Sequence, residues 1–241
     1  MDAISKIYPP GGKDKKRKHT LKGVSFNLYE GGVLGLLGEN GAGKTTLCGI
    51  LASLHPPTKG CIYWRGRSIK KQLMAYRAIM GFCPQSQQLN DFFSLEESLT
   101  FQGRAYGFSR EQTQKSVTKW MDKLGLQPYA KAFPKQLSGG YRQHFLIAKA
   151  LIHHPKIVLL DEPTVGLDPQ ACRQLWDCVS LLKEEGVSVI LTTHYLDEAE
   201  KLSDRICVLD HGLVKGIGTQ QELLEKYGQE SLEALFLEMI N

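Results

Sequence analysis

Short runs of continuous apolar residues recur along the chain, separated by segments whose apolar residues are three or four positions apart. The continuous runs predict strands buried on both faces, as in a parallel sheet covered by helices. They lie at residues 33–37, 79–83, 157–160 and 187–191. The spaced residues predict helices that pack one face against that sheet. They lie at residues 46–54, 117–124, 175–182 and 232–239. This alternation predicts an α/β fold.

The N-terminal side of the chain has a different pattern. Residues 4–8 predict a strand that ends at two prolines, and residues 21–29 alternate apolar and polar positions, as a half-buried strand does. Residues 60–65 predict a further strand. Near the C-terminus, residues 205–210 and 213–217 flank a His-Gly turn and predict a hairpin. We therefore expect a mixed sheet with an N-terminal antiparallel β part.

Residues 91–154 are predicted to be helical. Ser94 with Glu97 fits the capping box that begins a helix, and a second box starts at Ser109. The apolar face of the second helix is assigned to packing rather than to ligand binding; it consists of Val117, Trp120, Met121 and Leu124. We predict one domain, 1–241, with a core at 1–90 and 155–241 and a helical subdomain inserted at 91–154.

A glycine-rich sequence connects the first apolar run to a helical segment. It fits G-x-x-x-x-G-K-T, the pattern of a phosphate-binding loop, and a plain strand-to-helix connection would not need the Lys-Thr pair. The glycines let successive N–H groups face one anion, and the helix N-terminus adds positive charge. In such loops the lysine reaches the β- and γ-phosphates, and the threonine binds Mg²⁺. The predicted nucleotide-binding residues are Gly38, Glu39, Asn40, Gly41, Ala42, Gly43, Lys44, Thr45 and Thr46.

Two adjacent carboxylates, Asp161 and Glu162, end another apolar run. A buried strand would place Asp161 beside the phosphate loop, where it can hold Mg²⁺ through water. Side chains alternate along a strand, so Glu162 would point differently and act as the general base for an attacking water. The alternative, an ordinary acidic strand end, is disfavoured by the four apolar residues before Asp-Glu-Pro-Thr.

Charge and cysteine content disfavour other classes of protein. The net charge is +5, of which residues 13–18 carry +4. This cluster predicts a solvated hairpin tip rather than a basic face for nucleic acid. The six cysteines form no C-x-x-C pair and no metal-ligand spacing, which suits a reducing compartment. No apolar run reaches the roughly 18 residues of a membrane span, and we expect no signal segment, so a membrane role would come from a partner.

Further motifs occur in the order found in the nucleotide-binding subunits of ATP-binding-cassette (ABC) transporters. Besides the phosphate loop and the two carboxylates, these are a glutamine after proline at Gln85, Leu-Ser-Gly-Gly at 137–140, Gly-Leu-Asp at 166–168 and Thr-Thr-His ending at His194. The chain resembles this family over residues 8–194, and its tail resembles it too. The resemblance implies a P-loop NTPase core with a mixed sheet and an inserted helical subdomain.

The resemblance also implies a role for individual residues. Gln85 would ligate Mg²⁺ or the attacking water where the helical insert joins the core, and His194 would contact the γ-phosphate. Tyr8 would stack on adenine, although a strand-end aromatic is the alternative. The signature begins a helix and so forms a second anion site. If the helical insert projects away from the core, this site cannot reach the nucleotide of its own chain. It would then bind the ATP of a facing subunit. These signature residues are Ser138, Gly139 and Gly140.

One residue departs from the common family pattern. Tyr141 follows the signature, where a glutamine is common, while the Ser-Gly-Gly part remains. This replacement, together with residues 192–200 and the Leu-Glu-x-x-Phe tail at 232–236, resembles the ABC-2-type subfamily. That subfamily exports drugs, lipids or polysaccharides through a separate membrane subunit.

The function implied is that of an ATPase that binds ATP and Mg²⁺ and powers transport, most like export. ATP would close a head-to-tail dimer with a second nucleotide-binding subunit, either an identical copy or a related chain. Motion would pass to a transmembrane permease subunit. The chain would be cytoplasmic and peripheral on the membrane through that partner, with no nucleic-acid partner expected.

Four other functions share part of this set of motifs. A soluble ABC-type ATPase acting in an assembly process would need no membrane partner, and the motifs leave it open. DNA-repair members carry long coiled coils, for which residues 91–154 are too short. A small-molecule kinase or a GTPase would leave the Ser-Gly-Gly motif without a role, and no Asn-Lys-x-Asp guanine motif occurs. A non-hydrolysing scaffold is disfavoured because Lys44, Asp161, Glu162 and His194 are all present.

Overall fold

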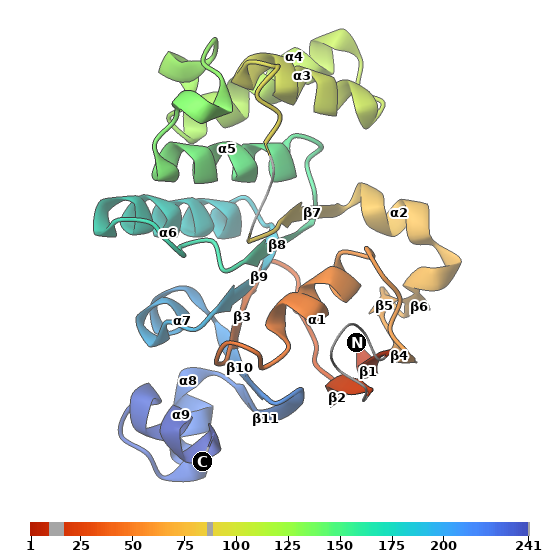
Figure 1. Ribbon diagram of the computed structural model, residues 1–241, viewed down its shortest axis with the longest axis vertical. Helices are drawn as coiled ribbons and strands as arrows, with labels where there is room; N and C mark the ends of the chain where they lie inside the picture. Colours follow the sequence, from red (N-terminus) through yellow and green to blue (C-terminus); the bar gives the residue numbers. More distant parts are fainter. Residues whose placement is uncertain (10–16, 86–88, 241) are drawn as a thin grey trace.

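The apolar runs form the centre of a six-stranded sheet in the computed structural model, which describes residues 1–9, 17–85 and 89–240 (Figure 1). The strand order is β11-β10-β3-β9-β8-β7, and all neighbours are parallel except β10 and β11. The bounds are β3 Val33–Leu37, β7 Met80–Cys83, β8 Ile157–Asp161, β9 Ser188–Thr193, β10 Arg205–Asp210 and β11 Leu213–Gly218. The predicted α/β class, mixed sheet and C-terminal hairpin are confirmed.

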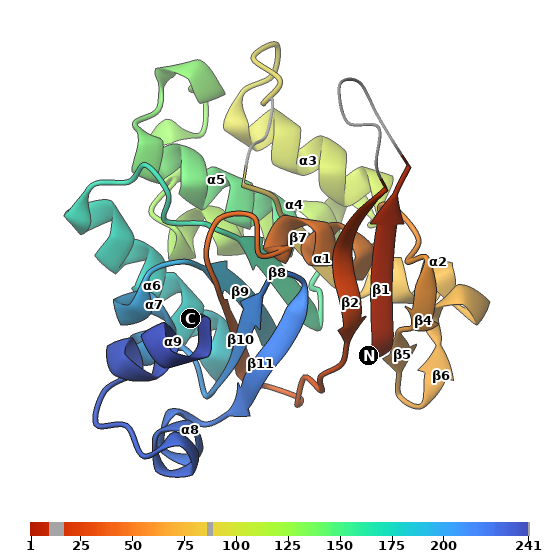
Figure 2. The ribbon, with the colours of Figure 1, turned by 60° about the horizontal axis from the view of Figure 1, so that its bottom comes forward.

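A smaller antiparallel sheet, ordered β2-β1-β4, lies beside the first helix (Figure 2). Its strands are β1 Asp2–Tyr8, β2 Lys18–Val24 and β4 Lys59–Cys61, and β5 Tyr63–Trp64 pairs with β6 Arg67–Ser68. The strand predicted over residues 21–29 ends instead at Val24. Phe26 is buried although it lies beyond the strand, so the alternation of apolar and polar residues indicated burial correctly but overestimated the strand length. The strand predicted over 60–65 is two strands because β4 pairs with β1 whereas β5 pairs with β6.

Helices follow the strands and fill the predicted insert. They are α1 Lys44–Leu51, α2 Leu73–Ala78, α3 Leu95–Ala105, α4 Arg110–Lys123, α5 Gly139–Leu151, α6 Pro169–Glu184, α7 Leu196–Leu202, α8 Gln220–Tyr227 and α9 Leu232–Ile240, with short 3₁₀ turns at Ile69–Lys71, Gln127–Tyr129 and Pro134–Gln136. Both predicted capping boxes form, at Ser94 and at Ser109. Among the described residues, none of these helices is both long and apolar enough to cross a membrane.

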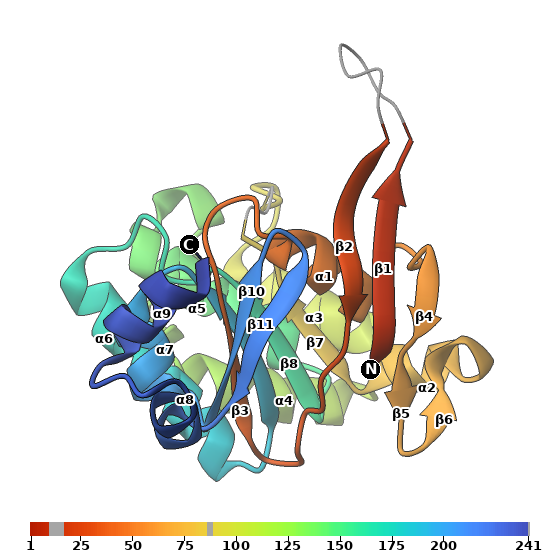
Figure 3. The same ribbon diagram turned by 90° about the horizontal axis from the view of Figure 1, so that it is seen from below.

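Each central strand contributes to two cores because successive side chains point to opposite faces. Leu159 and Ile190 pack with α1 and with the antiparallel sheet. Val158 and Leu160 pack on the other face with the helices that follow β7 and with α6. In Figure 3, α1 lies between the six-stranded sheet and β1–β2. The helix that follows the phosphate loop is therefore held on two sides.

The helical segment between β7 and β8 shares a hydrophobic core with the large sheet. Its second helix is also held by charge: Lys119 and Lys123 both form ion pairs with Glu185, at the end of α6. Hydrogen bonds from these two ammonium groups lower the pKa of Glu185 to about 2. The division of the chain into a core and an insert at 91–154 stays a prediction. Residues 13–16 of the basic cluster lie outside the described residues.

Candidate nucleotide-binding site

The parallel strands end at one edge of the sheet, and the predicted motif residues follow those ends. Gly38 follows β3, Glu162 follows β8 and His194 follows β9, while Gln85 lies just beyond β7. The strand register places Leu37 beside Thr193 and Asp161 beside Thr192. Ligands of α/β proteins bind at this carboxyl edge, outside the strand ends. The fold thus brings together motifs that are far apart in sequence.

The backbone of the phosphate loop requires glycine at two positions. At Gly43 the angle φ is 111°, and a Cβ would lie 3.0 Å from the carbonyl oxygen of Thr20. At Gly38 a Cβ would lie 2.2 Å from the carbonyl oxygen of Leu209. α1 begins directly after Gly43 without a side-chain cap. Its first backbone N–H groups are therefore left for an anion, so the loop fits a phosphate group.

A pocket of about 280 Å³ opens over this loop. Asn40, Gly41, Gly43, Lys44, Thr45, Thr46, Gln85 and Glu162 line it, as do Lys18 and Thr20 of β2. Three predicted loop residues are not in the lining: the carbonyls of Gly38 and Glu39 accept hydrogen bonds from Lys44, and Ala42 is buried. Lys18 and Thr20 were not predicted to lie in this pocket, because the crossing of β2 over the loop is a tertiary contact.

Glu162 is the centre of the polar contacts in this pocket. Its Oε1 atom lies 3.0 Å from the Lys44 ammonium, in an ion pair whose side chains are only 3% and 6% exposed. Gln85 donates a 2.8 Å hydrogen bond to Oε2. The Nδ1 atom of His194 lies 3.6 Å from Oε1 and makes no hydrogen bond to a described residue. Four residues that were predicted separately are thus brought together.

The backbone of Glu162 is held in an unusual conformation. Its φ of 48° lies in the left-handed region, which costs energy for a residue with a side chain. The surrounding structure compensates, because its N–H donates to both the carbonyl and the hydroxyl of Thr192, at 3.2 and 2.9 Å. This turn directs the carboxylate away from the strand and toward Lys44.

Asp161 lies beneath Glu162 and is 1% exposed. The Thr192 hydroxyl donates a 2.7 Å hydrogen bond to Oδ1. Burial raises the pKa of Asp161, while hydrogen bonds with Thr192, Cys48 and Thr45 favour the ionised form. The described residues contain no cluster of three or more His, Cys, Asp or Glu that could hold a metal by themselves. Asp161 and Thr45 instead fit Mg²⁺ that takes its other ligands from phosphate and water.

The signature residues form the start of a second helix. The Ser138 side chain caps α5 by accepting a hydrogen bond from the Tyr141 N–H, at 3.4 Å. Gly140 is needed for packing, since a Cβ there would lie 2.8 Å from the Cβ of Ala171 in α6; at Gly139 the nearest atom would be 3.6 Å away. These signature residues do not line the phosphate-loop pocket.

The structure shows a packing role for Tyr141 but does not test the predicted role of Tyr8. Tyr141, which departs from the common signature, packs its ring 4.5 Å from that of Tyr129 and edge-on to His144. It therefore contributes to the core of the helical segment. Tyr8 pairs with Lys18 across the β1–β2 ladder but does not line the pocket itself, so its stacking on adenine stays a prediction.

One buried carboxylate near the site was not singled out in the sequence. Glu198 is 1% exposed and accepts a 3.1 Å hydrogen bond from the Thr164 hydroxyl. Burial raises its pKa. Glu198 connects α7 to the segment that follows Glu162. Nothing in the Leu-Asp-Glu-Ala sequence of residues 196–199 shows which of the two acidic side chains will be buried.

Comparison with known proteins agrees with this geometry. Residues 21–165 match the family described as ABC transporter. The chain is 36% identical, over 93% of its length, to the linearmycin resistance ATP-binding protein LnrL of Bacillus subtilis, and covers 72% of that protein. It is 37% identical to human phospholipid-transporting ATPase ABCA3 and 40% identical to rat ATP-binding cassette sub-family A member 17. The matched region is 93% of this chain and 13% of each relative.

Solved structures give the same result. A structure of an ATP-binding subunit of an ABC transporter aligns with a TM-score of 0.84 at 29% identity, covering 98% of this chain and 97% of that one. A dimeric post-hydrolysis state of the cassette MJ0796, bound to ADP and Pi, aligns with a TM-score of 0.80 at 28% identity, covering 90% and 96%. The motifs, the fold and these matches agree, and the chain belongs to the ABC transporter family, as an ATP-binding cassette.

Proposed function

We propose that the chain binds Mg²⁺-ATP, hydrolyses it and powers transport as the ATP-binding subunit of an ABC transporter. One observation carries the proposal: Lys44, Gln85 and His194 converge on the Glu162 carboxylate beside an uncapped helix N-terminus. Phosphoryl transfer requires a cation that binds phosphate, a carboxylate that accepts a proton from the attacking water, and polar groups that orient the phosphate and the water.

The contacts of Lys44 indicate how ATP would change the site. Its ammonium lies 3.0 Å from Glu162 and donates to two loop carbonyls. Entering phosphates would compete with Glu162 for this ammonium and release the carboxylate to accept a proton from the attacking water. Gln85 would orient that water, and the His194 ring would contact the γ-phosphate. Mg²⁺, held by Asp161 and Thr45, would neutralise charge on the phosphates.

The position of the signature supports a dimer. Ser138, Gly139 and Gly140 do not line the phosphate-loop pocket of their own chain. We propose that they face the ATP of a second nucleotide-binding subunit, in a head-to-tail pair. The MJ0796 cassette, which aligns over most of the chain, is dimeric. Two sites would then be shared between two subunits.

An exposed aromatic surface supports a membrane partner. Phe92 and Phe101 are 89% and 70% exposed, and the ring of Phe93 stacks on that of Phe101 at 6.5 Å. Phe101 lies on α3, and Phe92 and Phe93 lie just before this helix. We propose that a transmembrane permease docks here, so that a change at Gln85 reaches it, and that the chain is held at the cytoplasmic face of the membrane. LnrL is named for resistance, which supports export.

Hydrolysis is tested by phosphate release from the purified chain, supplied with its permease. Glu162→Gln is expected to retain ATP binding and lose hydrolysis by about 10²- to 10⁴-fold, because the general base is removed. Wild-type turnover in Glu162→Gln would overturn the assigned role.

Docking is tested by recovery of the chain with membranes that contain the permease. Phe92→Ser together with Phe101→Ser should abolish recovery. Met74→Ser is a matched control, since Met74 is 76% exposed but lies on α2. Recovery that is equal in all variants would contradict docking at this surface. A chain that is never recovered with the permease would instead support the soluble assembly ATPase.

A further inference from the structure

A second cavity lies at the opposite edge of the large sheet from the phosphate loop. Its volume is about 560 Å³, twice that of the pocket over the loop. Met80, Ile157 and Ser188, which begin β7, β8 and β9, line it. The catalytic residues follow the other ends of these strands. Neither the nucleotide nor a second subunit bound at the phosphate-loop edge would cover this cavity, and no residue of the proposed mechanism contributes to it.

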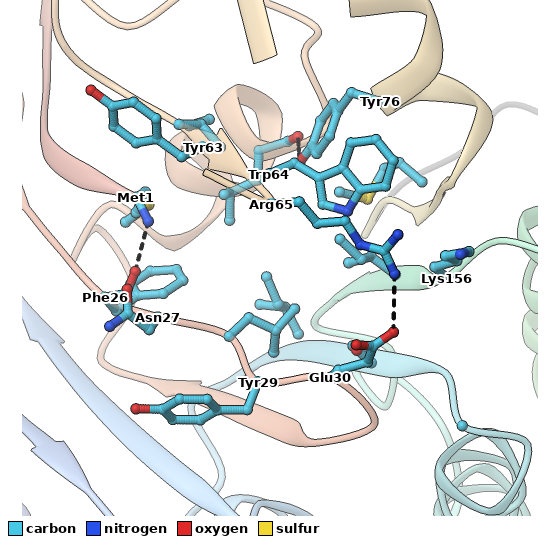
Figure 4. Close-up of a pocket in the computed structure, with 18 residues that line it drawn as sticks. Met1, Phe26, Asn27, Tyr29, Glu30, Tyr63, Trp64, Arg65, Tyr76 and Lys156 are labelled. Carbon is cyan, nitrogen blue, oxygen red and sulfur yellow. Dashed lines mark hydrogen bonds and ion pairs between the residues drawn. The ribbon is translucent and has the colours of Figure 1, made fainter. Parts of the chain in front are cut away.

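The inner wall of this cavity is apolar and aromatic. Ile62 and Ile190 line it, together with Phe26, Trp64 and Tyr76, which are labelled in Figure 4. The Tyr76 hydroxyl is not a free polar group in the cavity, because this hydroxyl donates a 2.7 Å hydrogen bond to the carbonyl of Leu51. A volume between roughly 300 and 1,000 Å³ with such a lining is typical of a small-molecule site. The wall therefore favours the apolar body of a ligand.

The mouth of the cavity carries an excess of positive charge. Arg65 reaches across to Glu30, with 3.5 Å between Nη2 and Oε1, and Lys156 lies on the same side of the view in Figure 4. The Lys156 ammonium has no ion-pair partner among the described residues. Arg65 and Glu30 are both well exposed, so their pair is weak and opens at little cost. The N-terminal ammonium of Met1, which donates to the Phe26 carbonyl, also lines the cavity, so one carboxylate of a ligand would offset part of this positive charge.

We propose that this cavity binds a small amphipathic carboxylate. Its apolar body would lie against Trp64 and Tyr76, and its carboxylate would lie between Arg65 and Lys156. At roughly 30 Å³ for each non-hydrogen atom in a liquid, the cavity holds up to about 20 such atoms. Burying the body while the charged group stays at the mouth satisfies both parts of the ligand. The proposal does not depend on ATP hydrolysis.

The test is a calorimetric titration of the full chain with decanoate, with decyltrimethylammonium as the probe of opposite charge. We expect saturable binding of one decanoate per chain and none of the cation. Lys156→Glu and Arg65→Glu should each weaken decanoate binding about three- to tenfold. Lys70→Glu is the matched control, because Lys70 is exposed in the same region but does not line the cavity; its affinity should be unchanged.

A cavity-filling variant tests the apolar wall. Ile62→Trp should abolish decanoate binding, and retained ATP binding would show that the variant is folded. Trp64 provides a second readout, since its fluorescence should change on binding in the wild type. The proposal is overturned if the ATP-binding wild type shows no saturable decanoate heat, if the cation binds equally well, or if Lys156→Glu and Lys70→Glu behave alike.

Discussion

Two helices of this chain begin at glycine-containing motifs, and their surroundings are very different. α1 follows Gly43 without a side-chain cap, and an ion pair between Lys44 and Glu162 lies beside its N-terminus. α5 follows Ser138, which caps it, and its Gly140 is pressed against α6. The edge of the parallel sheet supplies charged side chains to the first helix and not to the second. A helix N-terminus thus becomes a reactive site through what the sheet places near it.

The difference between the two helix ends also explains why one chain would hold only half of each site. The α1 end carries the glycine loop and the residues that we propose as metal ligands and general base. The α5 end carries N–H groups and a hydroxyl, which bind an anion but do not activate water. The two ends complement each other only if the α5 end of one subunit meets the α1 end of another. Three substitutions test this difference between the two helix ends, and a fourth tests how α4 is attached to the core.

The largest effect is expected at the α1 end. Lys44→Ala removes the proposed phosphate ligand and the charged partner of the buried Glu162 carboxylate, which keeps its hydrogen bond from Gln85. Breaking a buried ion pair costs about 3–5 kcal/mol of unfolding free energy. Urea unfolding measures this loss, and ATP binding should be lost with it. Adding Glu162→Gln should restore most of the stability but not the binding. A Lys44→Ala chain as stable as the wild type would contradict the buried pair.

A smaller effect is expected where α5 packs on α6. Gly140→Ala places a methyl group 2.8 Å from the Cβ of Ala171, and overpacking of this kind costs about 1–3 kcal/mol. Gly139→Ala is the matched control, with its nearest atom at 3.6 Å, and should be close to neutral in packing. Thermal unfolding of both variants checks the difference. Equal losses would show that Gly140 is not a packing residue.

The cap of α5 should matter more for hydrolysis than for folding. Ser138→Ala removes one side-chain cap at a long hydrogen-bond distance, so it should cost no more than about 1 kcal/mol of stability. ATP hydrolysis should fall about tenfold, because the hydroxyl would donate to a charged phosphate in the dimer. ATP affinity of the monomer should stay the same. A fall in monomer affinity would place Ser138 in its own chain's site instead.

The smallest effect concerns pH and the attachment of α4 to the core. The pKa of Glu185 is lowered to about 2 by Lys119 and Lys123, so the ion pairs stabilise the fold above the ordinary pKa of about 4.5. That contribution, about 1 kcal/mol or less, is lost as the pH falls from about 4.5 toward 2. Glu185→Gln should be slightly less stable than the wild type at pH 7 and equal to it near pH 2. A gap that stays constant with pH would contradict the assignment.

Local chemistry explains which features the sequence predicted. Capping boxes at Ser94 and Ser109, and the glycine loop before Lys44, depend on neighbours a few positions away, and all formed as expected. The contacts that were not predicted depend on strand pairing. Thr192 meets Asp161 because β8 and β9 run parallel in one register, and Thr20 meets Gly43 because β2 crosses the loop. No sequence spacing specifies these contacts.

Strand limits were predicted less well for a related reason. Alternation through Phe26 and Leu28 continues beyond Val24, where the ladder between β1 and β2 ends. A side chain can be buried without its backbone being paired, so periodicity alone overestimates a strand. The structural role of Tyr141 was likewise hidden, because Tyr129 lies on a separate turn of the helical segment.

Light scattering of Glu162→Gln, with and without Mg²⁺-ATP, tests whether two copies of the chain share each site. If the signature of one subunit completes the site of another, the mass should double only when Mg²⁺-ATP is present. Adding Ser138→Glu should prevent this, since a carboxylate there would repel the facing phosphates. A Glu162→Gln chain that binds ATP and keeps the mass of a monomer would contradict pairing between copies of this chain.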